Sequence, residues 1–301
     1  MGNITTEFPV TTLDGTELLP AGTVLTEEIL QGLARSNTTP TNEFLQLMDY
    51  GGIRQDLLIF IKYPPYHIVF SDQEENERIF KILGTVRLPL PVLESMDYFK
   101  KNDFQTYRHT LMVFIISVLL AEMIMPDSKE PFGCAFIGSS HDIGKTCVPL
   151  EILKKKTPLT KNEHKYLKHH AVAGYVLLSY FLKNHNSFIA RLARDHHERK
   201  DGSGYPLGIA QTDTMVEIVA VADVYDALLM PRSYRPISYD NRTALEEMTR
   251  MAERGAIGWD VVKALIARNR LEKPSYKDLV IPREKRGSAP SGNLYGKIVD
   301  E

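Results

Sequence analysis

The stretch LMVFIISVLLA (residues 111–121) decides the fold class, because it is the longest apolar run in this 301-residue chain. Ser117 interrupts the run and Glu122 follows it. It also falls well short of the roughly 20 apolar residues that a membrane-spanning helix needs. The run therefore predicts a helix buried in a protein core, and we expect no transmembrane segment.

Around this run, from residue 99 onward, apolar residues recur at helical spacing in segments joined by short polar or proline-containing loops. The segments are residues 103–125, 133–142, 160–182, 186–199, 215–229, 241–254 and 258–269. Strands and helices do not alternate in this pattern, so it predicts a mainly α protein with an all-helical bundle at residues 99–268. The tail at 269–301 is rich in Pro, Ser and charge, and we expect it to wrap the surface or fray.

Residues 1–98 predict a small mixed α/β domain that precedes the bundle. An Asp-Gly turn between two apolar runs indicates a hairpin within residues 8–25. Thr26 is placed to cap a helix that follows it, and residues 72–83 look helical. A regulatory or protein-contact role for this domain is one interpretation, and simple packing against the bundle is the other.

One segment of the first domain shows neither the hairpin pattern nor the helical pattern. Residues 57–70, LLIFIKYPPYHIVF, alternate in polarity and contain Pro64 and Pro65. Because proline is confined to edge strands and bulges within sheets, the segment predicts edge strands or extended loop.

Composition narrows the class of protein. The chain is 43% hydrophobic and 25% charged, and its two cysteines, Cys134 and Cys147, form no CxxC pair. This favours a reducing, cytoplasmic compartment. Residues 1–100 hold 7 Lys/Arg and 14 Asp/Glu. Subtracting these from the chain totals of 36 and 38 leaves 29 Lys/Arg and 24 Asp/Glu in residues 101–301, a net charge of +5. A mildly basic second half suits an anionic ligand, but clusters typical of nucleic-acid binding are lacking.

Histidines and aspartates gather in the helical half. The motifs GSSHDIGK (138–145) and VAVADVYDAL (219–228) each place an aspartate in an apolar helical stretch, where a buried carboxylate is costly unless paired or metal-bound. The candidate ligands are His109, His141, Asp142, His170, His196, His197 and Asp223. Together they have the composition of a metal site built from facing helices.

Each of these residues alone has a simpler explanation. His109 could sit in the core, Asp223 could cap a helix, and an isolated pair such as His196-His197 is usually one buried and one exposed histidine.

The seven residues together offer more ligands than one metal ion needs. Because a carboxylate can bridge two ions, the set predicts two metals about 3.5–4 Å apart, the spacing used in phosphoester hydrolysis. Imidazole and carboxylate ligands favour Fe, Mn, Zn or Ni.

The motifs carry a resemblance that covers roughly residues 105–267. They are HDIGKTCVPLEILKKKTPLTKNEHKYLKHHAVAG (141–174), HHERKDGSGYPLG (196–208), VADVYDAL (221–228), RSYR (232–235) and GWDVVKAL (258–265). In this order they resemble the HD-GYP family of the HD phosphohydrolase superfamily. The resemblance implies an all-helical bacterial hydrolase that converts cyclic di-GMP to the linear dinucleotide pGpG or to GMP.

The resemblance also implies roles for residues. One metal would be held by His109, His141, Asp142 and Asp223. Asp142 would bridge to a second metal held by His170, His196 and His197, and His169 would be a neighbour that binds no metal. The two divalent ions would be iron, with manganese or another transition metal as alternatives. Asp142 and Lys145 would be catalytic. The substrate-binding residues would be Lys145, Gly204, Tyr205, Pro206, Arg232 and Arg235, and the loop glycines would let the backbone approach the nucleotide.

The chain departs from the family pattern at three positions. Gln105 stands where many members have a glutamate ligand, which predicts two metals instead of three and slow turnover. Lys200 replaces a usual tryptophan, and Glu217 a usual arginine, which predicts an altered substrate rim. The alternatives are therefore a signalling module that binds cyclic di-GMP or a protein partner with little turnover, and a related enzyme for other nucleotides. Protein partners would bind the N-terminal domain or the GYP loop.

Overall fold

The computed structural model describes residues 4–38, 44–126, 138, 140–230, 237–291 and 298–299. Its first part contains β1 (Val10–Thr11), β2 (Glu17–Leu19), α1 (Glu27–Ser36), β3 (Phe44–Gln46), the 3-10 helix η1 (Leu47–Asp49), α2 (Ile53–Phe60), α3 (Tyr66–Val69), α4 (Gln73–Leu83), β4 (Arg87–Pro89) and α5 (Leu90–Asn102). Its second part contains α6 (Phe104–Ile124), the 3-10 helix η2 (Ile143–Cys147), α8 (Leu150–Leu153), β5 (Leu159–Thr160), α9 (Lys161–Phe181), α10 (Phe188–Asp195), α11 (Thr214–Leu229), α12 (Asn241–Glu253), α13 (Trp259–Arg268) and β6 (Ile298–Val299).

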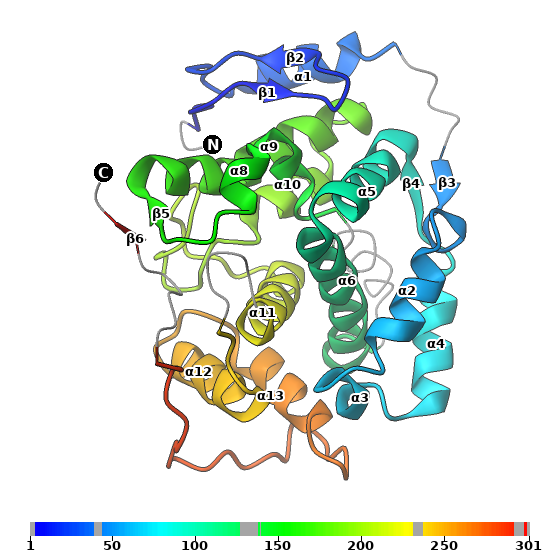
Figure 1. Ribbon diagram of the computed structural model, residues 1–301, viewed down its shortest axis with the longest axis vertical. Helices are drawn as coiled ribbons and strands as arrows, with labels where there is room; N and C mark the ends of the chain where they lie inside the picture. Colours follow the sequence, from blue (N-terminus) through cyan, green and yellow to red (C-terminus); the bar gives the residue numbers. More distant parts are fainter. Residues whose placement is uncertain are drawn as a thin grey trace.

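The arrangement is a mainly helical bundle around α6 and α11, which lie side by side in the middle of Figure 1. The helices α9 and α10 pack together on one side of this pair, and α12 and α13 on the other. The helices α2, α4 and α5 cover α6 from the remaining side, and α1 with the β1–β2 hairpin lies over α9. The mainly α prediction is confirmed.

Helix starts follow the capping chemistry of the sequence. The side chain that precedes a helix accepts a backbone N–H of its first turn at Thr26, Asp72, Asp103, Thr160, Asp213 and Asp240. Such caps satisfy N–H groups that have no partner inside the helix. The hairpin is also as predicted, with β1 and β2 antiparallel. The helix expected at 133–142 lies mostly outside the described residues.

The expectation for residues 57–70 is wrong, because the segment forms α2 and α3 instead of strands or loop. In α2 the buried residues Ile53, Leu57 and Phe60 follow helical spacing on one face. Pro65 lies at the N-cap position of α3, where the missing N–H of proline breaks no helical hydrogen bond. The apparent alternation in polarity was a helical pattern interrupted at the prolines.

The long apolar run lies in α6 and is buried, as predicted. By length and composition α6 could cross a membrane, but 78% of its apolar window is buried inside the fold, as in the core helix of a globular domain. A single apolar core joins buried residues from both predicted domains, such as Leu57 and Phe114. The predicted boundary at residues 98 and 99 lies within α5. The division into domains and the cytoplasmic location stay predictions.

The tail follows the surface of α12 and α13. Lys285 pairs with Glu253 at 2.6 Å, and the Gly287 N–H donates to Glu246 at 2.6 Å. Farther along, β6 pairs in parallel with β5. These contacts agree with the expectation that the tail wraps the surface.

Candidate metal centre

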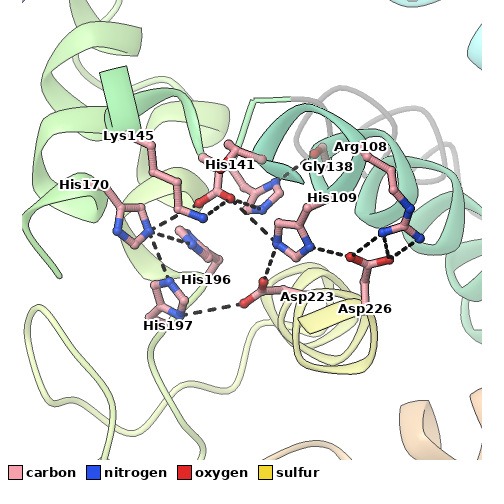
Figure 2. A network of polar contacts seen from close by, with 12 residues as sticks. Arg108, His109, Gly138, His141, Lys145, His170, His196, His197, Asp223 and Asp226 are labelled. Atoms are coloured by element: carbon pink, nitrogen blue, oxygen red, sulfur yellow. Dashed lines mark hydrogen bonds and ion pairs between the residues drawn. The ribbon is translucent and has the colours of Figure 1, made fainter. Parts of the chain in front are cut away.

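Five elements bring the predicted ligands together, although these residues span more than a hundred positions in sequence. His109 comes from α6, His170 from α9 and Asp223 from α11, whereas His141 and Asp142 precede η2. His196 and His197 follow the last residue of α10. Figure 2 shows the side chains of the five histidines and Asp223 turned toward one another. All are buried except His197, which is half-buried.

The ligand atoms form three overlapping groups in which all atoms lie within 4.8 Å of one another. The groups are His109 with His141 and Asp223, His170 with His196 and His197, and His141 with Asp142 and His196. Two of these match the two ligand sets expected from the sequence, and the third links them.

Asp142 lies between the two sets. Its Oδ2 atom is 3.3 Å from His141 Nε2 and 3.7 Å from His109 Nε2, and its Oδ1 atom is 3.4 Å from His170 Nε2. Each carboxylate oxygen therefore faces a different set. Lys145 also contacts Oδ2, so the buried carboxylate has a buried ammonium as its counter-ion.

Three histidines are oriented by the same kind of hydrogen bond, from Nδ1 to a backbone carbonyl. The Nδ1 atom of His141 is 2.8 Å from the Gly138 carbonyl, that of His196 is 2.8 Å from the Ala193 carbonyl, and that of His170 contacts the Leu167 carbonyl. A carbonyl oxygen only accepts, so each Nδ1 carries the proton. The Nε2 lone pairs are then left to face the cluster, as in histidines that bind metals.

The Nε2 atoms of these rings lie close together. His170 Nε2 is 3.3 Å from His196 Nε2 and 3.1 Å from His197 Nε2, and the buried His141 Nε2 has no hydrogen-bond partner. Burial lowers the pKa of His170 to about 4 and lowers that of His196 well below its usual value, so both rings are neutral at neutral pH. Converging neutral imidazoles next to buried carboxylates fit divalent transition metals.

The two aspartates stay ionised although they are buried. Burial by itself raises the pKa of Asp142, but Lys145 and His141 hold it well below its usual value. For Asp223, burial is likewise outweighed by two neighbouring histidines, His109, whose Nε2 atom lies 3.0 Å away, and His197. Burial alone would lower the pKa of His141, but the Asp142 carboxylate raises it. The cluster therefore holds anionic oxygens next to the neutral nitrogens of His170 and His196.

A close backbone approach sets the spacing between η2 and α9. A Cβ on Gly144 would stand 1.9 Å from the His170 carbonyl oxygen and 2.5 Å from the Gly174 nitrogen. Only glycine leaves room for this contact. It brings the turn that carries Asp142 next to the helix that carries His170.

One oriented histidine depends on a residue that sequence reasoning did not select. His109 Nδ1 lies 2.7 Å from Asp226 Oδ2, so this ring also points its Nε2 atom into the cluster. Asp226 lies three residues after Asp223 on α11, is fully buried, and also contacts Arg108 and Tyr66. A sequence signal existed, because VADVYDAL places a second aspartate one turn along the same apolar helix.

Glu198 anchors the GYP loop through hydrogen bonds to its backbone, and the sequence analysis did not select this residue. The buried carboxylate accepts the N–H groups of Leu207 at 2.5 Å and of Gly208 and Ile209 at 3.2 Å each. A Cβ on Gly204 would stand 2.4 Å from both Glu198 Cα and the His197 carbonyl oxygen. The glycine thus lets the loop pack against its own histidine turn, a role different from the expected approach to a nucleotide.

Four of the six predicted substrate-binding residues lie in or beside the cluster, and the other two lie outside the described residues. Lys145 lies in the cluster, and Gly204, Tyr205 and Pro206 lie in the loop beside it. The Tyr205 ring stacks on His197 with 4.6 Å between ring centres, and Lys168 lies over the tyrosine ring at 4.7 Å. Arg232 and Arg235 lie outside the described residues. His169 joins none of the three ligand groups of the described chain and packs against Phe8.

Two departures from the family pattern meet in space. Lys200 and Glu217 form an ion pair, which links the loop to α11. Gln105 lines a cavity of about 30 Å³ together with His109, Lys145 and other residues at the edge of the cluster. This agrees with its predicted position one turn before His109 on the same face.

Comparison with known proteins identifies the family. The HD domain family model matches residues 98–261, more than half of the chain. The chain is 36% identical over 165 residues to a cyclic di-GMP phosphodiesterase of Thermotoga maritima, covering 54% of this chain and 44% of that protein. It is 41% identical over 125 residues to the cyclic di-GMP phosphodiesterase response regulator RpfG of Xanthomonas campestris, covering 40% and 32%. A 3'3'-cGAMP-specific phosphodiesterase of Vibrio cholerae is 36% identical over 138 residues, covering 45% and 31%.

The chain belongs to the HD domain family, a class that this helical bundle with its His/Asp cluster fits. Within it, the GYP loop and these relatives make it an HD-GYP protein. The chain spans less than half the length of each of these relatives.

Proposed function

We propose that this protein is a metal-dependent phosphodiesterase that hydrolyses cyclic di-GMP to pGpG or GMP at a centre of two divalent metals, with iron the first choice. The observation that carries the proposal is Asp142, whose two oxygens face two separate histidine sets. The names of the HD-GYP relatives support the substrate class.

The residues that would hold the metals follow from the ligand groups. His109, His141 and Asp223 would hold one ion, and His170, His196 and His197 the other, with Asp142 shared. When bound, the ions would supply positive charge to the phosphate and make water more acidic.

The chain's own residues would prepare this site. Asp226 and the backbone carbonyls hold the imidazoles with Nε2 facing inward, so the site needs little rearrangement to accept a cation. The buried Lys145 ammonium is placed to attract a phosphate oxygen, because its present partner Asp142 would be shared with the metals. Arg232 and Arg235 would add contacts to the second phosphate or a guanine, for which the planar guanidinium is suited.

Products measured with metal-loaded protein test the proposal. Protein reconstituted with Fe²⁺ or Mn²⁺ without oxygen is expected to convert cyclic di-GMP to pGpG or GMP. A parallel assay with 3'3'-cGAMP tests whether the other named substrate class is preferred. Absence of product from both, with two metals bound per chain, would refute the enzyme proposal.

Two adjacent histidines offer a matched control. His169 and His170 are both buried, and burial lowers the pKa of each to about 4, but only His170 belongs to a ligand group. His170→Ala is expected to lose both bound metal and product formation, whereas His169→Ala keeps the metal. Equal metal loss in the two variants would contradict the ligand assignment.

A second candidate function is binding of cyclic di-GMP without efficient turnover. The observation that favours it is the Lys200–Glu217 ion pair, which stands where the family usually has a tryptophan and an arginine and so alters the substrate rim. The cavity lined by Gln105, His109 and Lys145 has a volume of about 30 Å³ and admits only a few waters, so a dinucleotide needs the surrounding wall of Leu153, Leu167 and Met230 to move. Tight binding of cyclic di-GMP by metal-loaded protein that releases no product would establish this second function.

A further inference from the structure

The Asp226 carboxylate is the meeting point of three elements. Its Oδ2 atom accepts the His109 Nδ1 proton at 2.7 Å, and its Oδ1 atom accepts the Tyr66 hydroxyl at 2.5 Å. The Arg108 guanidinium lies 3.3–3.4 Å from both oxygens (Figure 2). Asp226 is fully buried, so these donors set the direction of the carboxylate without competition from bulk water.

Two of the three donors depend on the N-terminal helices. Tyr66 is the first residue of α3 and only 1% exposed. Arg108 comes from α6, but its guanidinium lies over the rings of Tyr66, at 5.3 Å, and of Phe60 in α2, at 5.9 Å. The helices α2 and α3 therefore contact the hydrogen-bond network that orients a candidate metal ligand.

The Tyr66 hydroxyl is suited to be a permanent donor. Burial, together with the nearby Asp226 carboxylate, raises the pKa of this hydroxyl well above its usual value, so it keeps its proton. Since a carboxylate oxygen only accepts, the hydroxyl donates its proton to Asp226, while the Arg108 guanidinium lies next to the hydroxyl oxygen.

We propose that Tyr66 is a positioning residue of the metal centre, which makes the orientation of His109 depend on the docking of α2 and α3 against the bundle. The inference rests on the proposed metal site. Tyr66 holds Oδ1, so that Oδ2 stays directed at His109. Without the hydroxyl, Arg108 is the strongest remaining partner of the carboxylate and draws it away from the imidazole. His109 then loses the acceptor that fixes its tautomer and ring direction.

The expected loss of metal affinity follows from other proteins, in which removing a hydrogen-bond partner of a metal ligand lowers metal affinity by about 10- to 100-fold. Tyr66→Phe preserves the ring that packs on Arg108 and removes only the hydroxyl. We expect it to raise the Kd of one of two Mn²⁺ sites by about tenfold and to leave the other within twofold. In the activity assay kcat is expected to fall with KM little changed.

Tyr107→Phe is the matched control. Tyr107 is also 1% exposed, and its hydroxyl donates to Asp56 at 2.5 Å across the contact between α6 and α2. Its carboxylate partner Asp56 also pairs with Lys100 at 2.6 Å, and neither of these residues belongs to a candidate ligand group of the described chain. The variant thus loses a half-buried tyrosine–carboxylate hydrogen bond between the same two parts of the fold, and we expect it to keep both Mn²⁺ affinities.

Calorimetric titration of the metal-free proteins with Mn²⁺ decides between the outcomes. A tenfold weaker site in Tyr66→Phe alone supports the positioning role. Equal affinities in Tyr66→Phe and wild type overturn it, and so does the same weakening in both variants, which indicates general loosening. Wild-type protein that binds no Mn²⁺ would refute the metal centre itself, and with it both proposals.

Discussion

Replacement of Glu198 by glutamine is the sharpest test of how the GYP loop is held. The carboxylate accepts three backbone N–H groups, from Leu207 and Gly208 on Oε1 and from Ile209 on Oε2. A glutamine can keep its amide oxygen toward the first two donors. Its amide nitrogen then faces the Ile209 N–H, so one bond is lost and two donors oppose each other in a buried place.

The magnitude follows from these contacts. A hydrogen bond to a charged group contributes about 1.5–3 kcal/mol, and the two retained bonds weaken when the acceptor becomes neutral. We expect the closed loop to lose about 3 kcal/mol relative to its open form. Since 1.4 kcal/mol corresponds to about a factor of ten, opening becomes about 100-fold more frequent.

Hydrogen exchange of the backbone amides measures this directly. Exchange at Leu207, Gly208 and Ile209 is expected to accelerate by about 100-fold, while α6 and α11 keep their protection. Glu163→Gln is the control, since its carboxylate accepts the Thr160 N–H at 2.7 Å in the cap of α9 and no loop amide. Unchanged protection at the three loop amides in Glu198→Gln would refute the role assigned to this carboxylate.

The remaining predictions concern the cluster and its surroundings. Asp142→Asn is expected to lower metal content, because an amide bridges two cations poorly; full occupancy by elemental analysis would contradict the bridge. Gln105→Glu is expected to add metal or activity at the edge of the site, and a third metal at Gln105 in anomalous diffraction of the wild type would overturn the two-metal prediction. Burial lowers the pKa of His169 to about 4 against about 6.5 when unfolded, so the unfolded chain binds more protons between these values. The unfolding free energy of the metal-free protein should therefore fall as the pH drops from about 6.5 to about 4, and His169→Leu should flatten that slope by up to about 1.4 kcal/mol per pH unit; an identical slope in chemical denaturation would count against it. Lys200→Glu should destabilise the protein by about 1 kcal/mol and Glu217→Lys in the same chain should restore stability, whereas additive losses in thermal unfolding would show that the pair is not coupled.

The helices of the second half could be predicted closely because their signals are local. Thr160 caps α9 in a reciprocal pair with Glu163, and apolar spacing marks the buried face of each helix. The same reasoning failed at residues 57–70. There α2 and α3 are short and separated by Pro64-Pro65, so fewer than three turns of helical spacing were available to distinguish a helix from a strand.

The sequence by itself predicted which histidines and aspartates gather, because a carboxylate in an apolar helical stretch is costly unless paired or metal-bound and because the motifs follow the HD-GYP order. The seven predicted ligands lie together in the structure. The tertiary structure decided how they are oriented. Tyr66 and Asp226 are 160 residues apart, and Glu198 acts on amides of a loop that folds back over it. Such contacts leave no periodicity or fixed spacing in the chain, because a hydrogen bond between distant segments depends on how whole helices dock and on which backbone atoms that docking leaves without a partner.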